Sequence, residues 1–222
     1  MNRDHLDIAE IHFAKKDYAR AQEALDQCGS HLNIDGRRED LQLRIWEKQG
    51  RGDEICGLLR EQFLRHPSEE LLNRLTSMGT KKADLLEALS DHQNTADRFD
   101  AHAVGFLLKH GCRSQAESAV FHHAGRIWGG DTVNLRSLSE ALVKVRSPLA
   151  ASIVLRALLT DILDPPRRKA YGHAARYYHR LNMLAPSIKD WGPVPSHADF
   201  KTDFDARHKR KHAFWANVNP PS

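Results

Sequence analysis

Apolar residues recur every three or four positions along almost the whole chain, and short polar turns interrupt them. The first such stretch runs from Leu6 to Ala14, a turn follows at Lys16, and the next stretch runs from Tyr18 to Leu25. This spacing is that of one face of an α-helix. No segment alternates convincingly with a period of two, and Val and Ile cluster only inside helical patterns. The sequence therefore predicts an all-α fold of about eleven or twelve helices without a sheet.

An internal repeat indicates how these helices are arranged. Residues 16–21 align with residues 50–55, a shift of 34 positions, which is the period of tetratricopeptide-like repeats. The consensus of that repeat is met only loosely, by Ala9, Tyr18, Ala21 and Trp46. Two helices joined by a short turn cannot bury both of their faces alone. We therefore expect an α-solenoid of antiparallel helix pairs, a TPR- or HEAT-like superhelix with one concave and one convex surface.

Breaks in the pattern suggest the domain organisation. Residues 1–93 are predicted to form TPR-like hairpins, and residues 94–146 further hairpins of the same stack. Residues 147–217 are predicted to form a C-terminal module of three helices, and residues 218–222 a disordered tail. The polar stretch 91–95 is the expected seam. A hairpin is expected after it, with one helix from Phe99 to His110, a turn at Gly111, and a second helix whose apolar face extends to Trp128.

The C-terminal module has the clearest start and stop signals. Ser147 is expected to cap a helix that Pro148 begins, and this helix is apolar on much of its circumference to Leu163. After a Pro-Pro break, a helix is expected over 167–185 and a rigid loop over 191–195. Ser196 is then expected to cap one last helix. The apolar anchors of that last helix are Phe200, Phe204, Phe214 and Trp215.

Composition narrows the class of protein. The chain has 222 residues, of which 41% are hydrophobic and 28% are charged, an ordinary balance for a folded, soluble protein. No apolar run approaches the roughly 20 residues that span a bilayer, and no signal-peptide pattern precedes the first helix. Cys28, Cys56 and Cys112 are far apart and never form a C-x-x-C pair. We therefore expect reduced thiols in a cytoplasmic protein without a membrane segment.

The charge is unevenly distributed. Residues 1–100 hold 15 Lys and Arg against 20 Asp and Glu, a net of −5, whereas residues 165–215 hold 11 against 4, a net of +7. A basic end on an acidic chain favours an anionic partner, although a solvated helix face gives the same pattern. The predicted binding residues of this basic face are Arg167, Arg168, Arg176, Arg207, Lys209, Arg210 and Lys211. Tyr177 and Tyr178 could stack bases there, but their helical spacing favours the core.

The sequence contains few candidates for a catalytic or metal-binding site. His208 and His212 lie four apart with Asp205 one turn earlier, a spacing that can bind a transition metal, but the three cations between the histidines oppose a dication. No nucleophile elbow, P-loop or H-E-x-x-H is present. Asp161, Asp164 and His173 are the one set of acids and an imidazole that a helix turn could bring together, and a structural role beside Arg167 and Arg168 is favoured for the two acids. The prediction is therefore no catalytic residue, no metal and no cofactor.

Three segments carry a resemblance to a known family. They are SPLAASIVLRALLTDILD, RRKAYGHAARYYHRLNMLAP and HADFKTDFDARHKRKHAFW. They resemble the C-terminal region of a bacterial family of helical proteins of unknown function. The tail is similar to helical regions of bacterial SWIM zinc-finger proteins, although this chain lacks the C-x-C…C-x-H motif. The matching positions are Tyr171, His173, Ala174, Tyr177, His208, Lys211, Phe214 and Trp215. The resemblance covers about a third of the chain and implies a helical fold without an assigned activity.

These observations together favour a non-enzymatic scaffold or adaptor. Its concave surface would hold an extended or helical segment of a protein partner, and the basic end would select an acidic one. The alternative is a nucleic-acid-associated accessory protein that uses the same basic face. Salt dependence separates the two, because phosphate contacts release counterions and apolar contacts do not.

Overall fold

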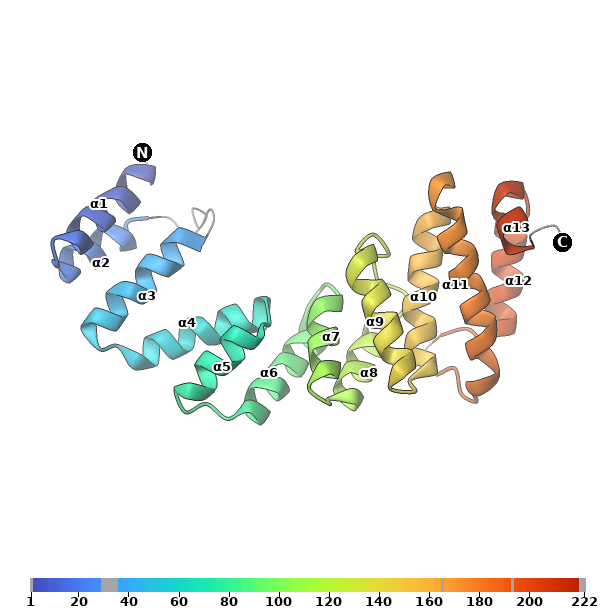
Figure 1. Ribbon diagram of the computed structural model, residues 1–222, viewed down its shortest axis with the longest axis horizontal. Coiled ribbons are helices and arrows are strands. Elements are labelled where there is room, and N and C mark those ends of the chain that lie inside the picture. Colours follow the sequence, from blue (N-terminus) through green and yellow to red (C-terminus); the bar gives the residue numbers. More distant parts are fainter. Residues whose placement is uncertain (1, 29–35, 165, 193, 220–222) are drawn as a thin grey trace. The chain divides into compact units, whose positions relative to one another are not determined.

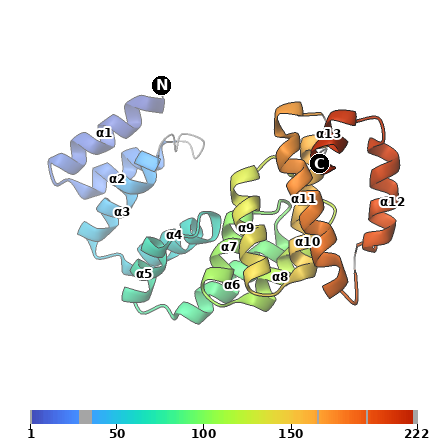
Figure 2. The same cartoon turned by 45° about the vertical axis from the view of Figure 1, so that its right-hand side comes forward.

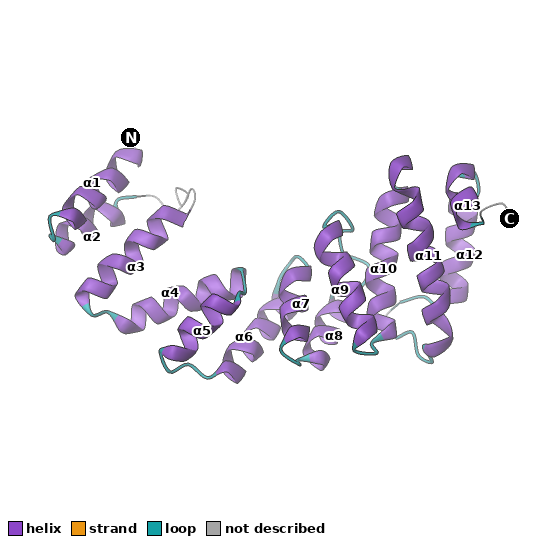
Figure 3. Cartoon of the chain, in the orientation of Figure 1, coloured by secondary structure: helices purple, strands orange, loops and turns teal. Residues whose placement is uncertain are grey.

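The computed structural model describes residues 2–28, 36–164, 166–192 and 194–219. Within these ranges every regular element is a helix and none is a strand (Figure 3). Thirteen α-helices lie in the described residues, one or two more than the spacing predicts. None of these described helices combines the length and the apolar character needed to cross a membrane.

The chain divides into two compact units, Met1–Arg65 with Glu70–Gly79, and His66–Glu69 with Thr80–Ser222. The helices of the first unit are α1 (Asn2–Ala14), α2 (Tyr18–Asp26), α3 (Arg37–Gln49), α4 (Gly52–Arg65) and most of α5 (Glu69–Ser77). Those of the second are α6 (Lys82–Thr95), α7 (Ala101–Lys109), α8 (Arg113–His122), α9 (Thr132–Lys144), α10 (Pro148–Leu163), α11 (Tyr171–Leu184), α12 (His197–His208) and α13 (His212–Val218). Two short 3₁₀ turns flank α11, at Arg168–Ala170 and Ala185–Ser187.

The expected seam at 91–95 is not a linker, because these residues form the last turns of α6. Ser90 and Gln93 are buried on that helix. The Gln93 carbonyl oxygen lies 2.9 Å from Nε2 of His123, a buried histidine at the end of α8. Gln93, one of the polar residues that suggested a loop, is therefore buried within the helix packing.

The first unit has a small apolar core between α1, α2 and α3. Its buried members are Ala9, Ala21, Ala24, Leu25, Cys28, Leu41 and Ile45. Gln22 and Gln42 join α2 to α3 by a reciprocal amide pair, with N–O distances of 3.1 and 2.6 Å. Gly29 and Asp35, at which the sequence pattern predicts the end of one helix and the start of the next, lie outside the described residues.

One backbone device recurs in the turns between helices. A residue with positive φ stands between α1 and α2, α3 and α4, α5 and α6, α7 and α8, and α9 and α10. These residues are Lys16, Gly50, Gly79, Gly111 and Arg146, at spacings of 34, 29, 32 and 35. In the turns at Lys16, Gly50, Gly111 and Arg146, the next amide donates to the carbonyl five residues earlier, the bond that closes a Schellman motif. The 34-residue shift in the sequence is the first of these spacings.

The second unit is built around α10. Helices α6, α8 and α10 contact one another in that order, α7 packs against α8 and α9, and α10 also packs against α9 and α11 (Figure 1). Eleven residues of α10 are buried, as its apolar circumference predicts. The predicted bounds are confirmed, but the Ser147 hydroxyl does not cap the helix. It donates instead to the Glu117 carboxylate of α8.

The structure corrects three predictions about the ends of elements. Helix α8 stops at His122, so the predicted face does not reach Trp128, whose side chain is 73% exposed. The C-terminal module has four helices, because the chain turns between α12 and α13 (Figure 2). The predicted tail begins too early: Val218 is buried at the end of α13, and its carbonyl lies 3.0 Å from Nε2 of His179. Residues 220–222 lie outside the described ranges.

Candidate functional site

The turn between α12 and α13 is fastened to the end of α10 by Lys211. Its Nζ donates to the Leu163 carbonyl at 2.8 Å and lies 3.9 Å from the Asp164 carboxylate. Carbonyls in the last turn of a helix have no intrahelical donor and carry partial negative charge, so an ammonium there is favourable. Lys211 is therefore part of the fold, although the sequence predicted it as a binding residue.

This anchor gathers exposed cations at one end of the second unit. Residues 167–169 follow α10 closely, because the Arg167 amide donates to the Ile162 carbonyl at 2.8 Å. Lys209 and Arg210 precede Lys211 in the turn that lies against the same helix end. We define the basic patch as the exposed residues Arg168, Lys169, Lys209 and Arg210. Among the described residues these four make no side-chain ion pair.

The other predicted binding residues have local partners. Arg167 pairs with Asp161 at 2.7 Å, as the sequence predicted. Arg207 pairs with Asp203 at 2.6 Å. Arg176 is exposed on α11, where its Nη2 lies 2.9 Å from Nδ1 of His173. Of the seven predicted binding residues, Arg168, Lys209 and Arg210 are thus exposed without an ion pair among the described residues, and Lys169 joins them in the basic patch.

An aromatic cluster holds α11, α12 and α13 together. We define it as Tyr178, Phe204, Phe214 and Trp215, whose ring centroids are 4.8 to 6.5 Å apart, mostly edge to face. Its polar atoms are satisfied: the Trp215 indole donates to the His208 carbonyl at 3.0 Å and the Tyr178 hydroxyl to Asp205 at 3.0 Å. Burial raises the pKa of Tyr178.

The positions that carry the family resemblance coincide only partly with the aromatic cluster. Phe214 and Trp215 are members, and the Tyr171 ring lies 6.0 Å from Phe214. Tyr177 is half-buried and His173 is exposed. Tyr178 and Phe204 are central to the cluster although neither is among the positions of the resemblance. Their helical spacing indicates a core position for Tyr178 and an apolar anchor at Phe204.

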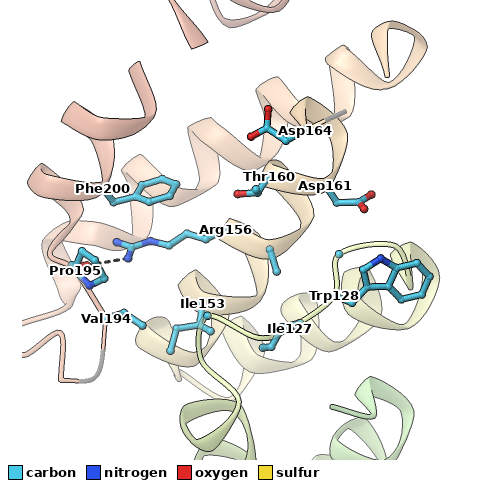
Figure 4. Close-up of a pocket in the computed structure, with 13 residues that line it drawn as sticks. Ile127, Trp128, Ile153, Arg156, Thr160, Asp161, Asp164, Val194, Pro195 and Phe200 are labelled. Carbon is cyan, nitrogen blue, oxygen red and sulfur yellow. Dashed lines mark hydrogen bonds between the residues drawn. The ribbon is translucent and has the colours of Figure 1, made fainter. Parts of the chain in front are cut away.

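A cavity of about 390 Å³ lies along α10, beside the loop after α8 and the start of α12 (Figure 4). One end holds Arg156, Val194, Pro195 and Phe200, and the other holds Trp128, Asp161 and Asp164. Thr160 and Ile153 of α10 and Ile127 of the loop complete the wall.

Arg156 is the unusual residue of this cavity. It is 8% exposed on an otherwise apolar helix, and desolvation lowers its pKa to about 10. Its Nη1 donates to the Pro195 carbonyl at 2.8 Å. The guanidinium lies 4.7 Å from the ring centre of Trp191 and 4.3 Å from that of Phe200, distances of cation–π contacts.

Trp128 stands at the other end of the cavity on a loop that contains two tightly packed glycines, of which Gly129 lies against α10. A Cβ on Gly129 would lie 2.3 Å from the Ala157 carbonyl oxygen, and one on Gly130 would lie 2.2 Å from the Trp128 ring. The sequence showed Gly129-Gly130 as a helix break and gave no sign that the loop wall approaches α10 so closely.

Comparison with known proteins identifies the family to which the chain belongs. The sequence matches a protein family described as a family of unknown function, DUF6880, over residues 8–217. The chain belongs to the DUF6880 family. Comparisons with curated proteins and with solved structures gave no match. Membership in DUF6880 rests on a far longer part of the chain than the C-terminal third that carries the resemblance, and it includes helices of the first unit.

In this DUF6880 chain, the two histidines considered for a metal are not on one helix. His208 ends α12 and is buried, whereas His212 begins α13 and is exposed. Burial lowers the pKa of His208, whose Nε2 lies 3.6 Å from the Asp164 carboxylate. Within the described ranges, no group of three or more His, Cys, Asp or Glu is placed to hold a metal ion.

The acid and imidazole set of the DUF6880 chain does not converge. Asp161 is engaged by Arg167 on one side of α10. Asp164 faces Lys211 and His208 at the end of that helix. His173 instead lies beside Arg176 on the exposed side of α11. The two carboxylates are placed for charge balance, as the sequence predicted for Asp161.

Proposed function

We propose that this chain is a non-enzymatic interaction module that binds an acidic segment of a protein partner at the basic patch. Its helix pairs, stacked as tetratricopeptide-like hairpins, would supply the rigid scaffold. The similarity of the tail to helical regions of SWIM zinc-finger proteins stays a prediction.

The observation that carries the proposal is the Lys211 anchor. By donating to the Leu163 carbonyl, Lys211 holds Lys209 and Arg210 at the end of α10 that residues 168 and 169 follow. The four cations are thus positioned by the fold rather than carried on a free tail. Preorganised cations bind carboxylates with less entropy loss than mobile ones.

A protein partner suits the patch better than a nucleic acid for two reasons. Single-stranded nucleic acids need exposed rings on which bases can stack, and Tyr178 is buried in the aromatic cluster while Tyr177 is half-buried. Asp164 and Asp203, which pair with Lys211 and Arg207 beside the patch, would also repel a continuous phosphate backbone. A short acidic peptide can contact the four cations and avoid those carboxylates.

The test compares two quadruple variants of the full chain. One changes Arg168, Lys169, Lys209 and Arg210 to Ala, and the control changes four exposed cations elsewhere, Lys15, Lys48, Arg60 and Lys81, to Ala. Both lose the same net charge. Each is titrated with an acidic peptide and with single- and double-stranded nucleic acid at low and moderate salt.

We expect the patch variant to lose at least tenfold in peptide affinity and the control to lose much less. Equal losses of peptide affinity in both variants would show that net charge alone attracts the peptide. The basic patch would then not be a specific binding site. Binding of nucleic acid alone, with a steep salt dependence, would move the assignment to the alternative function.

A further inference from the structure

The Arg156 guanidinium has donors that the rest of the described chain does not use. Nη1 bonds the Pro195 carbonyl. Nε and Nη2 are buried and have no hydrogen-bond partner among the described residues. Buried donors of a charged group are almost always paired in folded proteins, because leaving them unpaired forfeits the hydration energy of the cation. An unpaired edge on a residue that lines a cavity therefore points to a partner from outside the chain.

The neighbouring carboxylates do not supply that partner. Asp161 is neutralised by Arg167 at 2.7 Å. Asp164 lies by Lys211 and His208 at the far end of the cavity. Desolvation is the cause of the lowered pKa of Arg156, without an opposing contribution from a carboxylate. Arg156 is thus the uncompensated charge of this cavity.

The pair of unused nitrogens selects the chemistry of the ligand. Nε and Nη2 lie on one edge of the guanidinium, and two parallel N–H groups on one edge match the two oxygens of a carboxylate. The remaining wall is largely apolar, with Ile127, Ile153 and Val194, and the Trp191 and Phe200 rings flank the cation. We propose that the cavity binds a carboxylate carried on a small apolar or aromatic body, with Arg156 as its anchor.

Phe200 controls access to this edge. Nε and Nη2 have almost no exposed surface, so a ligand reaches them only after a side chain moves. Phe200 lines the cavity and also lies over the guanidinium, 4.3 Å from it. A change of the Phe200 rotamer opens the guanidinium to the cavity, and the ligand body then takes the space that the ring leaves.

The experiment uses the full chain and a matched pair of probes. 3-Phenylpropionate and 3-phenylpropionamide have the same body and differ in charge, and both are titrated by calorimetry and by tryptophan fluorescence. A short peptide ending in Phe, with a free or an amidated C-terminus, forms a second pair. The first pair tests a small acid as the ligand, and the second tests the end of a protein chain.

Three variants connect binding to the cavity. Arg156→Lys keeps the positive charge but removes the pair of parallel N–H donors, Nε and Nη2. Ala157→Phe fills the cavity with Arg156 in place, since Ala157 lines the wall and is only partly buried. Arg176→Lys is the control, because it makes the same change at an exposed arginine on α11.

We expect at least one acid to bind at least tenfold more tightly than its amide, and Arg156→Lys and Ala157→Phe each to lose at least tenfold, with Arg176→Lys unchanged. If neither acid binds, or if each acid binds no better than its amide, the proposal is wrong and ordered water is the partner of Nε and Nη2. Undiminished acid binding by a folded Ala157→Phe variant would also overturn it, because the acid would then bind elsewhere.

Discussion

The aromatic cluster and the Arg156 cavity share α12 but differ in how their polar groups are satisfied. Phe204 of the cluster and Phe200 of the cavity are one turn apart, with ring centroids 5.5 Å from each other. In the cluster, the Trp215 indole and the Tyr178 hydroxyl have partners within the chain. In the cavity, two donors of Arg156 have none among the described residues. The difference separates a region built for stability from one able to accept a ligand.

The largest effect should come from removing the centre of the cluster. Phe214→Ala should lower the free energy of unfolding by about 3–5 kcal/mol, because the side chain is fully buried among four other rings. The matched control is Trp128→Ala at the cavity, a larger aromatic that is 73% exposed. Denaturant melts of both variants measure the difference. Comparable losses would mean that the cavity wall is as much a part of the core as the cluster.

A smaller loss is expected at the anchor between α10 and α13. Lys211→Met should cost about 1–2 kcal/mol, since a charge-assisted bond to the Leu163 carbonyl is lost at a partly buried site. Lys209→Met, two residues away and exposed, should leave the unfolding free energy unchanged. If Lys209 and Lys211 prove equivalent in denaturant melts, the anchor does not hold the basic patch.

The pH dependence should be weaker still and should involve the cluster. His208 is buried against Phe204, with Asp164, Asp203, Arg207 and Lys211 around it, and burial lowers its pKa in the folded state. The unfolded chain then binds a proton more readily, so the stabilisation is present above the ordinary histidine pKa of about 6.5 and is lost as pH falls below it.

Unfolding free energies at pH 7.5 and 5.5 test this point. The decrease between the two values should be smaller in His208→Gln than in the original chain. His110 and His197, whose pKa values are also lowered by burial, should maintain part of the decrease. An identical decrease in unfolding free energy in the variant would show that His208 does not contribute to the pH dependence.

The smallest effect on stability is expected at Arg156. Arg156→Met loses the bond to the Pro195 carbonyl but also removes a buried charge without a counterion, so the two terms nearly cancel. We expect the unfolding free energy to stay within about 1 kcal/mol of the original. A loss comparable to that of Phe214→Ala would show that Arg156 fastens the 191–200 segment as a structural group.

The helices could be predicted where the sequence carries strong local signals. Ser147-Pro148 and the Pro-Pro break give α10 its bounds to the residue, because proline restricts the backbone at both ends. The turn between α12 and α13 has no such signal. It consists of Lys209, Arg210 and Lys211, three good helix formers, and is set by the tertiary bond from Lys211 to α10. Local propensity holds no information about that bond.

The sites were harder to predict for the same reason. The basic residues were found by counting charges, but the ion pairs that engage Arg167 and Arg207 depend on side-chain placement. The cavity was missed entirely, although one signal for it existed. Arg156 is the single basic residue in the apolar helix 148–163, and an arginine on such a helix must find a partner or a ligand.

The left-handed turns bear on how the chain folds in time. The turns at Lys16, Gly50, Gly111 and Arg146 each join two helices of one unit by bonds between residues at most five apart, so such a helix pair can close before any distant contact exists. Gly50, Gly79 and Gly111 enter the left-handed conformation at little steric cost, whereas Lys16 and Arg146 carry a Cβ. We therefore expect the helix pairs joined at Gly50 and Gly111 to form before those joined at Lys16 and Arg146.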